Sequence, residues 1–334
     1  NVLIRDNESF GDHANDYRDQ RDLLLDQLSK IVDVQYTEDD NGMINITSAG
    51  VNVLIGETVT ALTTANATTA TAGQLNGYVR SLQEADLIRN QLNGLVGTLV
   101  TGDIKVTLSN GYTTSTDLVA LNDVTVDGVG IVTAGTVIPA GSKITSSMDI
   151  MVKGFNGLHQ LGYSLTTPTS SGIPFFVSNG GTFTIDDIQV NPEILKDTNK
   201  IAASSQYEVD TNGVNKVIRG NSDIANAIAG LRDAIFTFPN ALTSLSEGTT
   251  DDYFRALVAD LGIRASNTER NYENEQTMVD NLQIQRQSVS GVSMDEELAD
   301  MIRFQQAYNA AARNMTVVDE MLDRVINSMG RVGL

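Results

Sequence analysis

The residue types that most often carry chemistry are few in this chain and far apart. Its only histidines, His13 and His159, are separated by 146 positions (159 minus 13), so they cannot form the i, i+4 pair that holds a catalytic zinc ion on one helix. His159 stands between Leu158 and Leu161, which favours a packed or capping histidine. The absence of cysteine excludes disulfides, thiolate nucleophiles and cysteine–zinc sites.

Three short motifs resemble ligand loops, and each is better explained as a turn. Asp39-Asp40-Asn41-Gly42 and Asp186-Asp187 lack the D-x-[DN]-x-[DN]-G spacing of a calcium loop. Gly128-Val129-Gly130 begins like a dinucleotide-binding loop, but no helical pattern follows it. A carboxylate pair for glycoside hydrolysis stays open among 42 acidic residues, although 5% aromatics and no tryptophan supply a sugar-binding cleft poorly. We expect no catalytic residue, no cofactor and no metal ion, and therefore not an enzyme.

The pattern with the clearest physical meaning is apolar and lies near the C-terminus. Two rows of side chains recur every seven residues, which is the a/d pattern of a coiled coil. The pattern predicts a helix over 293–329 with one apolar stripe that needs another helix to cover it. Ser293 and Glu296 form a capping box at its start. We call the two rows the seam: Met294, Met301, Tyr308, Met315, Leu322 and Met329, beside Phe304, Ala311, Val318 and Val325.

Composition limits the classes of partner. The 334 residues include 22 basic and 42 acidic side chains, a net charge of −20, so repulsion argues against binding nucleic acid or an anionic membrane. No apolar run reaches the roughly 18 residues that span a bilayer. The N-terminal residues, from Asn1 to Asp6, carry neither an initiator methionine nor a signal pattern, so we expect a fragment cut upstream.

Apolar periodicity predicts helices over 12–33, 73–99, 151–163, from Ser222, over 251–288 and over 293–329. The first helix would use Tyr17, Leu24, Leu28 and Ile31 as its apolar face, widened by Leu25 and Val32. The Asn41-Gly42 turn predicts a hairpin between 34–36 and 43–46, followed by a strand over 51–59. Residues 61–71 are expected to be a loop, and strands are expected at 175–177 and 182–185.

These elements predict an α+β protein, with an elongated helical bundle formed by the N- and C-terminal helices. Residues 1–99 and 150–292 would make a discontinuous helical domain, with a β-hairpin near 34–60. Residues 101–149, rich in Val, Thr, Gly and Asp, would form an inserted variable β subdomain. Residues 293–334 would form the C-terminal helix.

Several segments resemble a known family. Residues 288–297 (SVSGVSMDEE) and 303–308 (RFQQAY) resemble the start of the last helix of flagellar rod, hook and hook-associated proteins. Other segments are similar to the hook-associated protein 1 family in particular: 19–29 (DQRDLLLDQLS), 155–163 (FNGLHQLGY), Phe175-Phe176 and, more loosely, 220–227 (GNSDIANA). The resemblance runs from about Asp16 to the C-terminus except over 101–148, and the family's N-terminal helix is missing.

The resemblance implies a structural role. Family members leave the cell unfolded through the flagellar export apparatus and polymerise as a short ring at the distal end of the hook. There they join hook to filament, outside the cell. The implied partners are further copies of the chain, the hook protein, a neighbouring hook-associated protein and an export chaperone on the C-terminal helix. The resemblance implies no cofactor.

Three alternatives stay open. One is another axial protein, flagellin or hook-type, against which segments 19–29 and 155–163 argue. A second is an exported enzyme with its activity in the insert, which contains no histidine and no cysteine. The third is a secreted surface-binding module whose β insert contacts host molecules.

Overall fold

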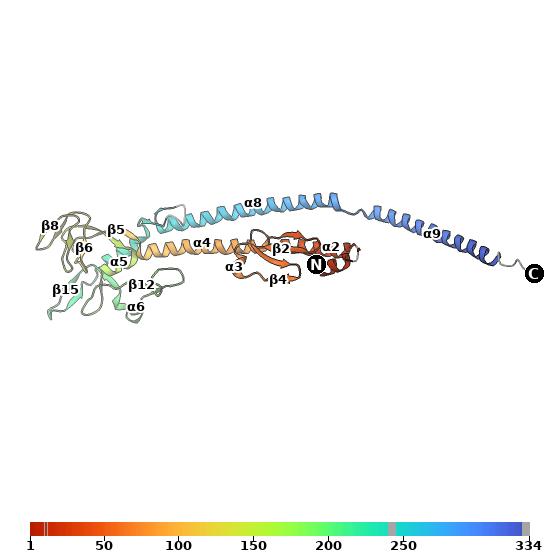
Figure 1. The fold of residues 1–334 in the computed structure, drawn as a ribbon. Coiled ribbons are helices and arrows are strands. Elements are labelled where there is room, and N and C mark those ends of the chain that lie inside the picture. The colour runs from red at the N-terminus through yellow and green to blue at the C-terminus, as the bar shows by residue number, and fades with distance from the viewer. Residues whose placement is uncertain (10, 12, 240–244, 329–334) are drawn as a thin grey trace, which may run out of the picture. The chain divides into compact units, whose positions relative to one another are not determined.

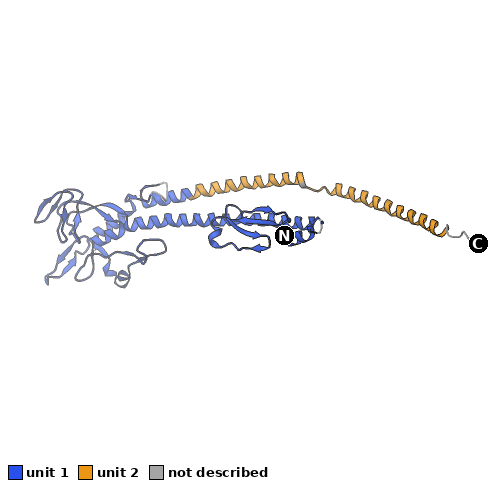
Figure 2. Cartoon of the chain, in the orientation of Figure 1, with its two compact units in different colours: residues 1–260 blue, residues 261–334 orange. Residues whose placement is uncertain are grey.

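The computed structural model describes residues 1–9, 11, 13–239 and 245–328 of the chain. It combines long helices with small antiparallel strand pairs, which confirms the α+β class (Figure 1). The chain divides into two units, residues 1–260 and 261–334 (Figure 2). The predicted domain boundaries, and the bundle joining the two ends of the chain, stay predictions.

The predicted helices are present with changes at their ends, and the described residues contain three short helices that were not predicted. The helices are α1 (Val2–Glu8), α2 (Asn15–Ile31), α3 (Thr64–Ala67), α4 (Gly73–Thr101), α5 (Gly154–Leu161), α6 (Pro192–Lys196), α7 (Asp223–Ala229), α8 (Thr250–Ser290) and α9 (Met294–Ser328), with 3-10 turns η1 (Thr198–Lys200) and η2 (Gly230–Arg232).

The strands form one four-stranded sheet, β1-β2-β3-β4, and a series of two-stranded pairs. The sheet consists of β1 (Gln35–Glu38), β2 (Ile44–Ser48), β3 (Val51–Ile55) and β4 (Thr58–Val59). The pairs are β5 (Asp103–Leu108) with β10 (Met148–Lys153), β6 (Leu118–Val119) with β9 (Val137–Ile138), β7 (Val124–Val126) with β8 (Gly130–Val132), β11 (Tyr163–Ser164) with β14 (Ala202–Ser204), β12 (Phe176–Ser178) with β13 (Ile188–Val190), β15 (Tyr207–Val209) with β16 (Asn215–Val217), and β17 (Phe236–Thr237) with β18 (Glu247–Gly248).

A small apolar cluster holds α2 against the four-stranded sheet. Leu25 of α2 and Ile44 and Ile46 of β2 are its buried members. The predicted hairpin is confirmed, with Glu38 of β1 opposite Ile44 of β2. The predicted apolar face of α2 is only partly right, because Leu24 and Ile31 are exposed while Leu25 is buried.

The helix α4 begins beside the end of α2. Gly73 has a φ of +74°, and a Cβ there would lie 2.6 Å from the backbone carbon of Ile31. Both facts require glycine. Any other residue would be strained at this positive φ, and its Cβ would collide with the backbone of Ile31. The other end of α4 packs through Leu92, Leu95 and Leu99 against the main core.

The main core of unit 1 combines the β-rich segment with α5, α7 and the first turns of α8. Ile104, Val124, Ile144, Leu158 and Ile224 are all at most 2% exposed, and they belong to one cluster. The segment 101–149 therefore shares its buried side chains with residues on both sides of it in the sequence.

Buried tyrosines in this core have their hydroxyls paired. Tyr112 donates to the carbonyl of Leu161 at 3.0 Å, and Tyr253 donates to the carbonyl of Gln91 at 3.0 Å. Burial raises the pKa of Tyr112, because the phenolate would lose its hydration. The core is thus closed around satisfied polar groups.

Several local predictions were wrong. Residues 151–153 belong to β10 rather than to a helix, since Ile150 and Val152 pair with Val106 and Ile104 of β5. The segment 182–185 is not a strand, and β12 pairs instead with β13. The expected loop 61–71 contains α3, and α1 was not anticipated. The helix from Ser222 ends at Ala229, so Ile235 does not share its apolar face and is exposed.

Candidate assembly interface

The helix α9 begins where the sequence predicts. The backbone amide of Glu296 donates to Ser293 Oγ at 3.4 Å, which is the half of the capping box that the structure records. The amide of Glu297 donates to the Ser293 carbonyl at 3.0 Å. The acidic side chains of the first turn also suit the positive end of the helix dipole. The start of α9 is therefore fixed by its own sequence.

The described seam residues are all exposed on α9. This holds for Met294, Met301, Phe304, Tyr308, Ala311, Met315, Val318, Leu322 and Val325. Met329, the last predicted member, lies outside the described residues. The structure thus places these side chains on one described helix, in the predicted rows, and open to solvent. Whether they form an interface stays a prediction.

The apolar surface of α9 is wider than the predicted rows. Leu298, Met321 and Ile326 are also exposed, and they stand three or four residues from seam positions. They fall outside the heptad rows, and i, i+3 and i, i+4 spacing in the sequence is the signal that identifies them. A stripe of this width suits contact with more than one neighbouring helix.

Charges along α9 border the apolar stripe. The Arg303 guanidinium lies 3.4 Å from Asp300 Oδ1 and 5.4 Å from the centre of the Phe304 ring. This places a cation against the exposed face of a seam residue, where cation–π attraction orients the ring.

The segment 155–163, which carried part of the resemblance, has a packing role in the structure. The Asn156 side chain donates to the Phe176 carbonyl and accepts from the Phe176 amide, both at 2.8 Å. His159 Nδ1 donates to the Ile173 carbonyl at 2.5 Å, and its Nε2 accepts from the Ala202 amide at 2.9 Å. Three of these bonds tie α5 to β12 and β14, and the bond to Ile173 ties it to the loop before β12.

His159 is a buried neutral group in this arrangement. It is 1% exposed, and burial lowers its pKa below the usual 6.5, with the Ile173 carbonyl opposing that shift. A Cβ at Gly172 would lie 1.8 Å from the His159 carbonyl oxygen, so only glycine fits there. The prediction of a packed histidine is confirmed.

The segment 19–29 has a comparable role in holding α2. Arg21 Nη1 donates to the Gly42 carbonyl at 3.2 Å and to Glu38 at 3.3 Å, which links α2 to the hairpin. One turn earlier, Arg18 donates to both carboxylate oxygens of Glu8, at 2.7 and 2.8 Å, and to Glu38 at 2.7 Å. The hydrogen bonds from Arg18 lower the pKa of the Glu8 carboxyl.

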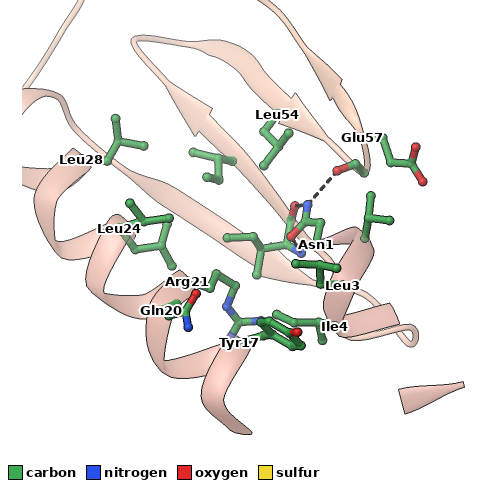
Figure 3. Close-up of a pocket in the computed structure, with 15 residues that line it drawn as sticks. Asn1, Leu3, Ile4, Tyr17, Gln20, Arg21, Leu24, Leu28, Leu54 and Glu57 are labelled. Atoms are coloured by element: carbon green, nitrogen blue, oxygen red, sulfur yellow. Dashed lines mark hydrogen bonds between the residues drawn. The ribbon is translucent and has the colours of Figure 1, made fainter. Parts of the chain in front are cut away.

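A groove of about 660 Å³ lies between α1, α2 and the β2–β3 strands (Figure 3). Its lining is mostly aliphatic, including Leu3, Leu24, Leu28 and Leu54. Asn1 closes one side by donating to the Gly56 carbonyl at 2.7 Å. Tyr17, Arg21 and Glu57 also line it, and its mostly aliphatic surface fits packing against another apolar surface.

In residues 1–9, 11, 13–239 and 245–328, no three His, Asp or Glu side chains are placed to hold a metal ion. Among the same residues, no helix has the length and hydropathy needed to cross a bilayer.

Two models of flagellar protein families match this chain. Residues 1–176 match the model of the flagellar hook-associated protein FlgK helical domain, and residues 285–329 match the flagellar basal body rod FlgEFG protein C-terminal model. The first match runs through residues 101–148, the segment where we expected the family likeness to lapse, and the second covers all of α9.

Curated relatives agree with the family models. Flagellar hook-associated protein 1 of Bacillus subtilis is 31% identical over 99% of this chain and 62% of the relative. The protein of the same name from Escherichia coli is 25% identical over 95% of this chain and 65% of the relative. The chain thus spans a little under two thirds of the length of these relatives. Because the helical-domain model covers more than half of its residues, the chain belongs to the FlgK family of flagellar hook-associated proteins.

Proposed function

We propose that this chain is a structural subunit of the bacterial flagellum, which polymerises at the distal end of the hook and joins hook to filament. The names of its relatives, flagellar hook-associated protein 1, support the association with the hook. The match of residues 285–329 to a rod-protein C-terminal model supports α9 as the part shared with other axial proteins. The relatives are structural flagellar proteins, which agrees with a non-enzymatic role.

The observation that carries the proposal is the exposure of the seam on α9. Covering one large apolar side chain stabilises a structure by about 1.5–3 kcal/mol. Repeated along the seam, this gain is comparable with the whole stability of a typical domain, roughly 5–15 kcal/mol. A helix with that much uncovered surface gains most by packing against neighbouring helices, so the seam is the proposed assembly interface.

The proposed partners follow from this interface. Further copies of the chain in a ring, the hook protein and a neighbouring hook-associated protein would cover the seam at the junction. An export chaperone would cover it before the chain leaves the cytoplasm for the extracellular flagellum. The absence of cysteine suits a chain that crosses the export apparatus unfolded, since no disulfide can trap it.

The test replaces three central seam residues. The triple variant Met301→Ser, Tyr308→Ser and Met315→Ser should lose polymerisation and filament attachment, while the core around Leu158 stays folded by circular dichroism. A matched control changes three exposed residues on the opposite face of α9, namely Gln306→Ser, Arg313→Ser and Glu320→Ser, and should assemble normally. Full filaments from the seam variant would contradict the proposal.

A cross-linking experiment distinguishes assembly at the hook–filament junction from assembly along the filament. Residues of α9 should cross-link to hook protein and to a few copies of the chain. Cross-links along the length of the filament would instead favour flagellin-like assembly.

Surface binding by the segment 101–149 is a second candidate. The observation in its favour is the β7–β8 hairpin, which exposes Val129 and Ile131 at its end. The variant Val129→Ser with Ile131→Ser should leave hook-to-filament attachment unchanged, and loss of attachment would assign the hairpin to the junction instead.

A further inference from the structure

The methionines of this chain are unevenly placed between core and surface. Met148, in the main core, is 0% exposed. Four methionines of α9 lie open to solvent: Met294 is 75% exposed, Met301 60%, Met315 74% and Met321 59%. Three of the four are seam residues, and Met321 stands next to the seam residue Leu322. The thioethers are therefore concentrated on the one helix whose apolar surface the proposed assembly would cover.

An exposed thioether reacts with peroxides in a defined way. The sulfur lone pair takes one oxygen atom from hydrogen peroxide, the O–O bond breaks, an S–O bond forms and water leaves. The sulfur is oxidised by two electrons and the peroxide is reduced by two. The product, methionine sulfoxide, is polar where methionine was apolar, and reductases specific for its two epimers reverse the reaction.

The consequence differs between a lone helix and an assembled one. On the exposed helix a sulfoxide is hydrated, so α9 tolerates it. In a completed interface the same sulfoxide would be buried among apolar side chains, and burying a polar group without a hydrogen-bond partner is unfavourable. Oxidation would therefore oppose assembly without unfolding the core.

We propose that Met294, Met301, Met315 and Met321 form an oxidation site through which peroxides block the assembly surface of the unassembled chain. This inference rests on the proposed function, because it takes α9 as the assembly surface. It adds a reversible chemical control at that surface. Once neighbouring helices cover the seam, the same methionines are shielded from the oxidant.

The chain contains its own reference residues for a test. Met151 and Met278 are exposed but lie outside α9, on β10 and α8, so their oxidation reports exposure without touching the seam. Met148 reports the closed core. Met329 lies outside the described residues, and its peptide is followed separately.

The experiment treats the purified chain with hydrogen peroxide and maps each methionine by peptide mass spectrometry. Polymerisation onto isolated hooks is then measured. We expect the four α9 methionines to oxidise well before Met148. We also expect the treated chain to polymerise at least about tenfold less, because burying one or two sulfoxides in the interface is unfavourable. Incubation with both sulfoxide reductases should restore polymerisation.

Two variants make the test specific. The quadruple variant with Met294→Leu, Met301→Leu, Met315→Leu and Met321→Leu keeps the apolar surface and should polymerise after peroxide treatment. The variant Met151→Leu with Met278→Leu should stay as sensitive as the unchanged chain. If the quadruple variant does not polymerise, single Met→Leu variants should each recover part of the resistance.

The outcomes separate this inference from the proposed function. Undiminished polymerisation after oxidation of all four α9 methionines would overturn the inference. It would also be overturned if the α9 methionines oxidised no faster than Met148. If the triple seam variant to serine polymerises, the proposed function fails instead, and the inference falls with it even if the mapping shows fast oxidation on α9.

Discussion

The main core of unit 1 and the seam of α9 contain the same kinds of side chain in opposite surroundings. Leucine, valine and methionine are closed off in the core, where Met148 and Leu158 have no exposed surface. On α9 the same residue types are open to solvent along the described helix. Apolar periodicity therefore specifies which face of an element must be covered, but not whether the cover comes from the same chain.

The largest difference should appear when one leucine of the core is truncated. Leu158→Ala leaves a cavity in the main core and should lower the free energy of unfolding by about 2–5 kcal/mol. Met301→Ala on the seam should change the free energy of unfolding of the dilute chain by less than about 0.5 kcal/mol, because the Met301 side chain is mostly exposed to solvent. Urea unfolding followed by circular dichroism measures both. Equal losses would mean that the seam is already packed in the lone molecule.

A smaller loss should follow removal of the Asn156 side chain. Asn156→Ala leaves the partly buried amide and carbonyl of Phe176 without this partner and should cost about 1–3 kcal/mol. The exposed Asn226→Ala on α7 serves as the control and should be nearly neutral by the same urea measurement. If the two variants unfold alike, water replaces the Asn156 contacts and the link between α5 and β12 is weaker than the geometry indicates.

The pH dependence of unfolding should report His159. Its folded-state pKa lies below the unfolded value of 6.5, so the unfolded chain binds the proton more readily. The contribution of His159 to stability is complete above 6.5 and falls as the pH drops toward the lowered folded-state pKa. Comparing urea midpoints at pH 7.5 and 5.5 tests this. His159→Gln should flatten the difference.

The smallest effect is expected from the ion pairs of Arg18. Its contacts with Glu8 and Glu38 lie near the surface, with the Arg18 side chain 30% exposed, and solvent screens such pairs. Arg18→Gln should shift the urea midpoint less than Leu158→Ala, and the shift should shrink further at high salt. A shift that grows with salt would assign Arg18 a packing role instead.

The sequence was most informative where the signal is local and repeated. The rows of α9 and the Asn41-Gly42 hairpin could be predicted because heptad spacing and turn chemistry depend on neighbours in the chain. The likeness of 155–163 to a known segment was visible too, but not its reason, which is a set of hydrogen bonds to Phe176, Ile173 and Ala202.

The wrong predictions concern segments whose structure depends on pairing with strands far away in the sequence. Residues 151–153 look helical locally, yet the register with β5, about 46 positions earlier for Met151 and Lys105, makes them a strand (151 minus 105). The choice of 188–190 over 182–185 as partner of β12 has a similar origin. Asp187 accepts hydrogen bonds from the amides of Asn179 and Gly180, which fixes the connecting loop and leaves β13 beside β12.

The central claim is that neighbouring molecules, and not this chain itself, cover the apolar surface of α9. Its most direct test is hydrogen–deuterium exchange, measured on the dilute chain and on the chain polymerised onto hooks. In dilute solution the amides of 294–328 should exchange far faster than those of β5 and β10, because a helix without tertiary contacts opens readily. After polymerisation onto hooks they should become as slow as the core. Slow exchange of α9 in the dilute chain, equal to that of β5, would contradict the account.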